Sequence, residues 1–183
     1  MKASQTFDLV VAGAGFAGLV AANRAAQLGL KVVVLERSNE ELYPCNSRFA
    51  GGILHISYHD VTDPQPALVQ AIEAITGGCA DAALATILAG TAQRAVAWLA
   101  EEGTAFNRTG SVSWRKCVLA PPRPPVTHMD WKGRGADMAL RGLEENFIRR
   151  GGELHRGTRA LELIMNGGRC VGVNAEQGAA RRA

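Results

Sequence analysis

The residues Asp8–Glu36 read DLVVAGAGFAGLVAANRAAQLGLKVVVLE, in which two valine-rich runs enclose glycines that lie close together. The first run, Phe7–Ala12, is short and apolar and predicts a fully buried strand. Residues Gly15–Leu28 predict a helix whose alanines allow it to lie close to a sheet, and Lys31–Leu35 predicts a second buried strand. Two strands joined by one helix form a right-handed crossover, and this arrangement predicts a parallel sheet.

The three clustered glycines suit a phosphate-binding turn. The connection from the first strand to the helix is tight, and Gly13 supplies the backbone freedom that it needs. Gly15 leaves the first helical turn bare, so that a pyrophosphate can approach unpaired N–H groups at the positive end of the helix dipole. Gly18 allows the helix to pack against the strands. We expect Phe16 and Ala17, in the same turn, to contribute to the binding site.

A single carboxylate ends the second strand. Glu36 follows Gly18 by 18 residues, where an acidic side chain accepts hydrogen bonds from the ribose hydroxyls of a dinucleotide and repels a 2′-phosphate. The order of strand, glycine turn, helix, strand and acid predicts dinucleotide binding much more strongly than the glycines alone. These residues leave the choice between FAD and NAD open.

Three blocks of sequence resemble one family of flavoproteins. Around the glycine turn, the pattern resembles the amino-terminal FAD fingerprint through Ala22, Gly29, Val32 and Leu35-Glu36-Arg37. The segment NSRFAGG, Asn46–Gly52, resembles the second flavin-contacting loop of the fumarate reductase and succinate dehydrogenase flavoprotein family, which includes tricarballylate dehydrogenase and ketosteroid dehydrogenases. Residues 133–173 resemble the helix, strand and hairpin by which these proteins return to the FAD domain.

The resemblance implies specific contacts with FAD. Asn46 and Ser47 would bond phosphate or ribityl oxygens, with ordinary turn capping as the alternative role. The backbone of Gly51-Gly52 would lie against the isoalloxazine, and the backbone of Ala160 would bond the adenine; Arg37 completes the predicted cofactor-binding set. Many relatives have Gly-Gly where this sequence has Pro44-Cys45. Residues 44–52 contain no histidine, so FAD is expected to be noncovalent.

The resemblance also implies an activity. It predicts an FAD-dependent oxidoreductase that dehydrogenates or reduces a carbon–carbon bond in a small carboxylate such as tricarballylate, fumarate or succinate, with an electron-transfer partner compatible with this chemistry. The fold is expected to be incomplete relative to the family, with the unidentified catalytic residues beyond residue 183 and the chain inactive by itself. The alternatives are a noncatalytic dinucleotide-binding fragment and an NAD-linked dehydrogenase.

Several histidines follow the flavin loop. The pair His59-Asp60 resembles one in the tricarballylate branch, and His55 or His59 is a candidate to orient a carboxylate or relay a proton, because the histidine pKa lies near neutrality. The alternative is a structural histidine bonded to backbone. His128 and Trp131 either reach a substrate pocket or anchor a proline-rich loop.

The whole chain is predicted to form one FAD-binding domain, residues 1–183, of the Rossmann-like α/β class. The first expected parts are an irregular flavin loop (38–63) and a helical insert (64–103) with helices over Pro66–Thr76 and Asp81–Glu102. A strand over Ser111–Leu119 and a proline-rich loop (120–133) are expected next. The return segment (134–176) is expected to contain a helix over Arg134–Arg150, a short strand and a β-hairpin or meander that turns at Asn166-Gly167.

Composition excludes several other classes. The 183 residues are 47% hydrophobic and 20% charged, and the net charge of +3 comes from scattered basic residues, which argues against a nucleic-acid partner. We expect no transmembrane segment and no secretory signal, and therefore a cytoplasmic protein. The four cysteines form no Cys-x-x-Cys pair, so we expect reduced thiols and no metal site. The oligomeric state is left open.

Overall fold

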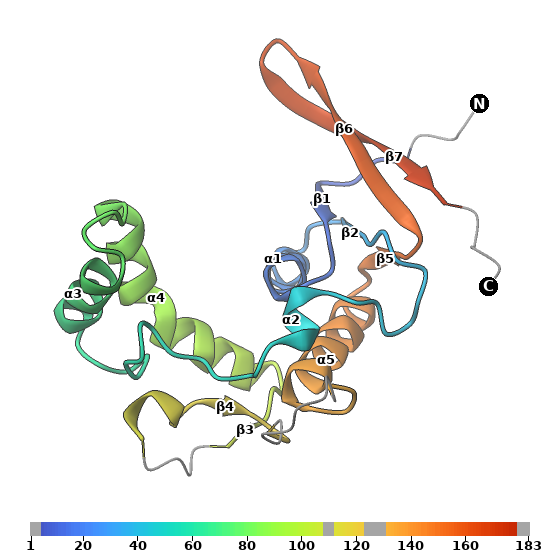
Figure 1. Cartoon of the computed structure of the whole chain (residues 1–183). Helices are drawn as coiled ribbons and strands as arrows, with labels where there is room; N and C mark the ends of the chain where they lie inside the picture. The colour runs from blue at the N-terminus through green and yellow to red at the C-terminus, as the bar shows by residue number, and fades with distance from the viewer. Residues whose placement is uncertain (1–4, 108–111, 123–130, 179–183) are drawn as a thin grey trace. The chain divides into compact units, whose positions relative to one another are not determined.

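The computed structural model describes residues 5–107, 112–122 and 131–178 (Figure 1). The chain divides into two compact units, residues 1–48 with 143–183 and residues 49–142. One boundary, between residues 48 and 49, falls inside the predicted flavin loop, and the other, between residues 142 and 143, falls inside the predicted return helix. The single FAD-binding domain over 1–183 stays a prediction.

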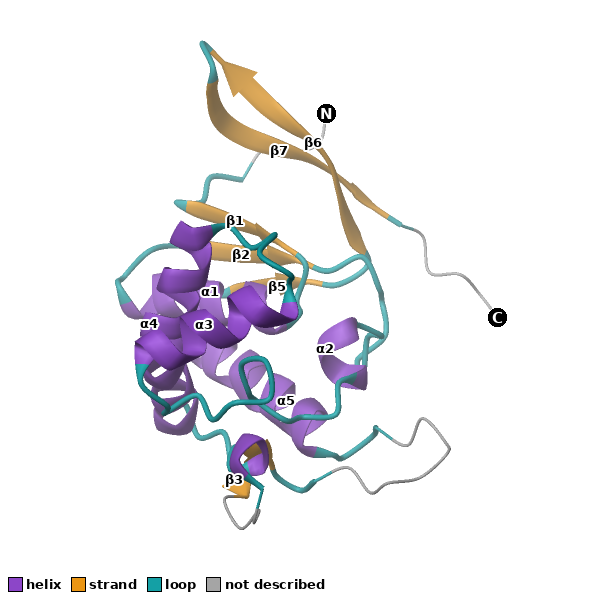
Figure 2. Ribbon diagram, turned by 60° about the vertical axis from the view of Figure 1, so that its left-hand side comes forward, coloured by secondary structure: helices purple, strands orange, loops and turns teal. Residues whose placement is uncertain are grey.

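The first unit contains a three-stranded parallel sheet of β1 (Leu9–Ala12), β2 (Val32–Leu35) and β5 (Glu153–His155), in the order β1-β2-β5 (Figure 2). The predicted parallel sheet is confirmed. All four residues of β2 are buried, as predicted. The prediction of a fully buried β1 is wrong, since its residues are half-buried or exposed. Among the described residues, β1 is one of the two edge strands of this sheet and pairs with β2 alone.

Helix α1 (Phe16–Gln27) connects β1 to β2, as predicted, and is fastened by one buried amide. The Asn23 side chain is fully buried, and its Nδ2 donates to the carbonyls of Leu19 (2.9 Å) and Leu143 (2.8 Å). Its Oδ1 accepts from Arg150 Nη1 at 2.6 Å. Leu143 lies in α5 (Gly135–Arg149), the predicted return helix, which begins in the second unit and ends in the first.

A long antiparallel hairpin of β6 (Thr158–Asn166) and β7 (Arg169–Gln177) follows β5 (Figure 1). The predicted hairpin is confirmed, but the turn at Asn166-Gly167 is wrong by one residue. The two central turn residues are Gly167 and Gly168, with φ of +56° and +79°. A two-residue hairpin turn of this type needs positive φ at both central residues, and two glycines adopt it readily.

The second unit contains α3 (Gln65–Ile75) and α4 (Ala82–Glu101), which confirm the two predicted helices, and a two-stranded antiparallel sheet of β3 (Phe106–Asn107) and β4 (Val118–Leu119). The short α2 (Asn46–Phe49) lies at the division between the units. Asp81 caps α4 by accepting from the Leu84 N–H at 2.9 Å.

The predicted strand over Ser111–Leu119 is wrong. Residue 111 lies outside the described residues, Ser113–Arg115 form a 3₁₀ turn, and only Val118–Leu119 are extended and paired. The turn places the Trp114 ring against His55 and Tyr58, and such contacts, distant in sequence, override strand propensity.

Helix α4 is long and apolar enough to cross a membrane by length and composition alone, with 28% of its apolar window buried. One such helix in the described part of the chain is weak evidence for a membrane span, because core helices of globular proteins pass the same test. The absence of a transmembrane segment stays a prediction.

Candidate cofactor site

The glycine turn has the geometry that its sequence predicts. Gly13 adopts φ of +97°, and its N–H donates to the Leu35 carbonyl at 2.8 Å, which ties the turn to the end of β2. A Cβ placed on Gly18 would lie 2.0 Å from the Gly13 carbonyl oxygen and 3.2 Å from Val11 Cγ1. Any side chain at Gly18 would therefore push α1 away from β1 and from the turn.

The amino terminus of α1 is capped from a distant loop. Gly15 is the N-cap residue and has no side chain to offer, so the Phe16 N–H donates instead to Ser47 Oγ at 3.0 Å. A Cβ on Gly15 would lie 3.2 Å from that same oxygen. The first turn of α1 carries no acidic residue, and its N–H groups suit an anion. The structure thus brings together the two predicted phosphate contacts, the glycine turn and Ser47. Asn46 precedes Ser47 in the chain and Ala17 follows Phe16, and both are exposed.

Glu36 is buried at the edge of the same turn, with 6% of its surface exposed. Its Oε2 accepts from the Ala14 N–H at 3.2 Å, and its Oε1 accepts from the Ser38 N–H at 2.9 Å. A carboxylate oxygen has more than one acceptor position, so both oxygens retain capacity for ribose hydroxyls. Arg37, the next residue, is exposed.

The start of β6 joins this end of the sheet. The Thr158 N–H donates to the Glu36 carbonyl at 2.9 Å, and the Gly157 N–H donates to the Ser38 carbonyl at 2.9 Å. Ala160 follows two residues later, half-buried and paired with Ala175 of β7. The predicted adenine contact therefore lies on the strand that begins beside Glu36.

Sequence reasoning missed two residues that hold the flavin loop to the glycine turn. The fully buried Tyr43 hydroxyl donates to the Ala14 carbonyl at 2.7 Å. Arg48, 1% exposed, donates from Nε to the Tyr43 carbonyl at 3.0 Å, and its guanidinium lies 4.6 Å from the centre of the Tyr43 ring. Burial, together with the Glu144 carboxylate, raises the pKa of Tyr43 far above its ordinary value, so the hydroxyl remains a donor. The sequence feature that could have identified Tyr43 is its position as the lone aromatic residue in the polar stretch 38–48.

The glycine pair of the flavin loop lies in the second unit. Gly52 is buried at φ of +76°, and its carbonyl accepts from the Leu119 N–H at 2.7 Å. The Leu54 N–H donates to the Cys117 carbonyl at 2.8 Å, so this segment runs antiparallel beside β4. Gly51 is exposed, and a Cβ there would meet nothing within 4 Å. Its backbone is therefore open to a flat ligand, and its contact with flavin stays a prediction.

The histidines have structural partners. His55 Nδ1 accepts from the Tyr58 N–H at 3.2 Å, which favours the structural alternative for that nitrogen, and His59 Nδ1 lies 3.5 Å from Asp63 Oδ2. Trp131 packs edge-on against Phe49 at 5.4 Å, which favours an anchoring role; His128 lies outside the described residues. None of the four cysteines forms a disulfide bond within the described residues. Among the described residues, no group of three His, Cys, Asp or Glu side chains is placed to hold a metal ion.

Asp60 lies in a small pocket of about 200 Å³. Burial raises the pKa of its carboxyl group, but hydrogen bonds from Thr62 N and Oγ1, both at 2.9 Å, and from Lys116 Nζ, at 3.4 Å, outweigh burial and lower the pKa below 3.8. The pocket is lined by Asp60, Val61, Thr62, Val96, Lys116 and Cys117. It contains none of the predicted cofactor-binding residues, and we interpret Asp60 as structural.

A parallel strand–helix–strand unit with a bare helix amino terminus and a terminal acid defines a Rossmann-like dinucleotide-binding fold. The sequence profile of the FAD binding domain family matches residues 8–183, and the chain belongs to this family. FAD is therefore the cofactor, as predicted.

Two similar proteins agree with this assignment. Fumarate reductase (cytochrome) from Shewanella frigidimarina is 26% identical over 168 residues, which cover 87% of this chain and 28% of that protein. The structure of 3-ketosteroid-Δ4-(5α)-dehydrogenase from Rhodococcus jostii RHA1 shares the fold, with a TM-score of 0.75 and 22% identity over 93% of this chain and 42% of that one. The predicted kinship with the fumarate reductase and succinate dehydrogenase flavoproteins is confirmed.

One match points elsewhere. Human mitochondrial peptide deformylase is 39% identical over 79 residues, which cover 42% of this chain and 31% of that protein. A match to less than half of the chain does not set its family. The chain spans less than half the length of each of these three relatives.

Proposed function

We propose that this protein is part of an FAD-dependent oxidoreductase that dehydrogenates or reduces a carbon–carbon bond in a small carboxylate such as fumarate, succinate or tricarballylate. The observation that carries the proposal is the convergence of the glycine turn, Ser47 and Glu36 at one end of α1 in a chain of the FAD binding domain family. The resemblance to fumarate reductase supports the type of reaction.

The residues present fit a dinucleotide. Gly18 permits the close approach of α1 to the turn, and the first helical turn carries no acidic residue of its own. In the proposed complex, the Ala17 N–H and the Ser47 hydroxyl, whose oxygen already accepts from the Phe16 N–H, donate to the pyrophosphate.

The other predicted contacts orient the rest of the cofactor. Glu36 accepts from the adenosine ribose, the Ala160 backbone bonds the adenine, and Asn46 bonds phosphate or ribityl oxygens. The backbone of Gly51-Gly52, which is open at Gly51, lies along the isoalloxazine. Bound FAD supplies two-electron chemistry, and the protein supplies binding and orientation.

The base and the substrate-binding residues are unassigned. Because the chain spans 28% of the fumarate reductase that it resembles, we propose that turnover requires segments equivalent to the rest of that protein, and that an electron-transfer partner supplies or removes electrons. A noncatalytic cofactor-binding module is the second candidate, and it shares the same cofactor site.

Purification tests the proposal. The chain is expected to copurify with yellow, noncovalent FAD that is released by denaturation and identified by chromatography. Reduction of bound flavin by succinate, or reoxidation of reduced flavin by fumarate, supports the oxidoreductase. Bound FAD that no carboxylate oxidises or reduces, even in a longer protein containing this chain, supports the noncatalytic module. A chain that binds NADH and no FAD contradicts both.

A further inference from the structure

A strained turn follows the glycine pair of the second unit. Ile56 and His59 exchange backbone hydrogen bonds of 3.1 and 2.7 Å, which makes Ser57 and Tyr58 the two central residues of a tight hairpin turn. Both have positive φ, 46° and 64°. Turns of this kind strongly prefer Asn-Gly or Gly-Gly, and two successive left-handed residues that both carry side chains are energetically unfavourable. Strain of this kind concentrates at binding sites.

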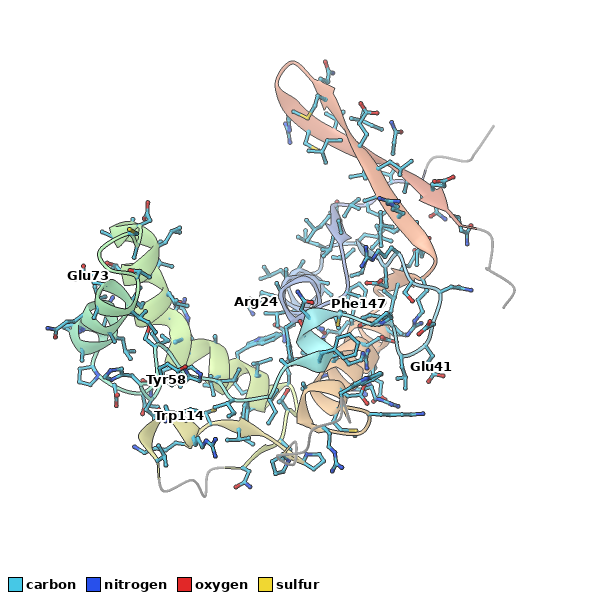
Figure 3. The ribbon with its side chains drawn as sticks, in the orientation of Figure 1. Arg24, Glu41, Tyr58, Glu73, Trp114 and Phe147 are labelled. Carbon is cyan, nitrogen blue, oxygen red and sulfur yellow. The ribbon has the colours of Figure 1, made fainter. Side chains whose placement is uncertain are left out.

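The strained turn carries an exposed aromatic ring. The Tyr58 ring stacks on the His55 imidazole with 5.2 Å between centroids and 16° between planes, yet Tyr58 remains 59% exposed. Trp114, from the 3₁₀ turn, meets both rings edge-on at 5.4 and 5.5 Å. Figure 3 shows Tyr58 and Trp114 beside each other. We name His55, Tyr58 and Trp114 the aromatic platform.

A cation borders the aromatic platform. The Arg115 guanidinium lies 4.7 Å from the centre of the Trp114 ring, and Arg115 is exposed. The neighbouring Lys116 is paired with Asp60, and the His59 imidazole lies 3.5 Å from the Asp63 carboxylate. Within residues 5–107, 112–122 and 131–178, Arg115 forms no ion pair. An exposed flat ring and a guanidinium held on the adjacent indole together suit a ligand with a planar ring and an anionic group.

We propose that the aromatic platform and Arg115 bind a carboxylate that bears a planar ring, with the ring stacked on Tyr58 and the carboxylate paired with Arg115. The inference goes beyond the proposed function, because fumarate, succinate and tricarballylate carry no ring. A fumarate-sized molecule has no ring to use the exposed face of Tyr58.

Calorimetric titration of the full FAD-loaded chain with three probes tests the proposal. Cinnamate has both ring and carboxylate, cinnamamide has the ring alone, and fumarate has carboxylates alone. We expect cinnamate to bind at least about tenfold more tightly than either of the others. Tyr58→Ala should weaken cinnamate binding about tenfold or more, and Arg115→Gln should weaken cinnamate but leave cinnamamide unchanged. Leu84→Ala and Arg94→Gln, exposed positions on α4, are matched controls and should change neither.

Tyr58→Gly is a second variant that separates loss of the ring from misfolding, because glycine adopts the positive φ without strain while it removes the ring. It should fold at least as stably as the original chain and still lose cinnamate affinity. Fumarate binding equal to cinnamate binding, no cinnamate binding at all, or unchanged cinnamate affinity in Tyr58→Gly would overturn the proposal. FAD binding is titrated separately, and the probe titrations are repeated on cofactor-free chain, so a failure of the FAD site is distinguished from a failure of the aromatic platform.

Discussion

Ser47 Oγ accepts the N–H of Phe16 at 3.0 Å and so caps a helix that begins 31 residues earlier in the chain. Gly15, at the N-cap position, has no side chain to do this. The flavin loop therefore satisfies the donor that the glycine turn leaves open. One hydroxyl links two motifs that the sequence assigns separately to the same cofactor.

Ser47→Ala should destabilise the cofactor-free chain by about 1 kcal/mol, the usual cost of losing an N-cap oxygen, and should also weaken FAD binding. Chemical denaturation and FAD titration measure the two effects. Ser38→Ala is the matched control, since Ser38 Oγ accepts only a local, exposed bond from the Glu40 N–H. Equal losses in both variants would contradict a special role for Ser47.

Glu36→Ala should weaken FAD binding by about 1–3 kcal/mol, the cost of losing hydrogen bonds to a buried charged group. Titration of flavin fluorescence measures the change. Because Glu36 also accepts from Ala14 and Ser38, the free energy of unfolding must be measured alongside. Glu40→Ala, at an exposed position in the same loop, should leave FAD affinity unchanged. If Glu36→Ala binds FAD as well as the original chain, the ribose contact is wrong.

Gly18→Ala should lower the free energy of unfolding by about 1–3 kcal/mol, as overpacking commonly does, because the new methyl would lie 2.0 Å from the Gly13 carbonyl oxygen. Gly142→Ala provides the contrast. Gly142 lies inside α5, where an added Cβ would meet nothing within 4 Å, so alanine should stabilise the helix by about 0.5–1 kcal/mol. Thermal denaturation of both variants should show shifts of opposite sign; shifts of the same sign would rule out the close approach at Gly18.

The Asp60 carboxyl group should make stability depend on acidic pH. The pKa of this group is lower in the folded chain than the ordinary 3.8. Its contribution to the free energy of unfolding is therefore complete above pH 3.8 and is lost as the pH falls through the pKa of the folded chain. Asp60→Asn should therefore be less stable than the original chain at pH 7, and the difference should shrink below about pH 4. Denaturant titrations across pH 2–7 follow this difference. A constant difference over that range would show that the ionised form is not the one the fold prefers.

The sequence predicted what local patterns determine. Valine runs, alanines and glycines define β2, α1 and the tight turn, and the spacing to Glu36 places the acid at that turn. It could not predict that β1 would be half-buried, since that depends on which strands lie beside it. The contacts of Tyr43 with Ala14 and of Trp114 with Tyr58 join residues far apart in the chain, and no periodicity encodes them.

The buried amide of Asn23 also restricts how α1 can move. Successive residues of a helix are about 100° apart around its axis, so a shift of α1 by one residue would swing this amide away from the Leu143 carbonyl and from Arg150 and leave buried polar groups unsolvated. The contacts of Asn23 with α5 and Arg150 therefore fix the rotation of α1 about its axis, and with it the orientation of the glycine turn at the amino-terminal end of the helix.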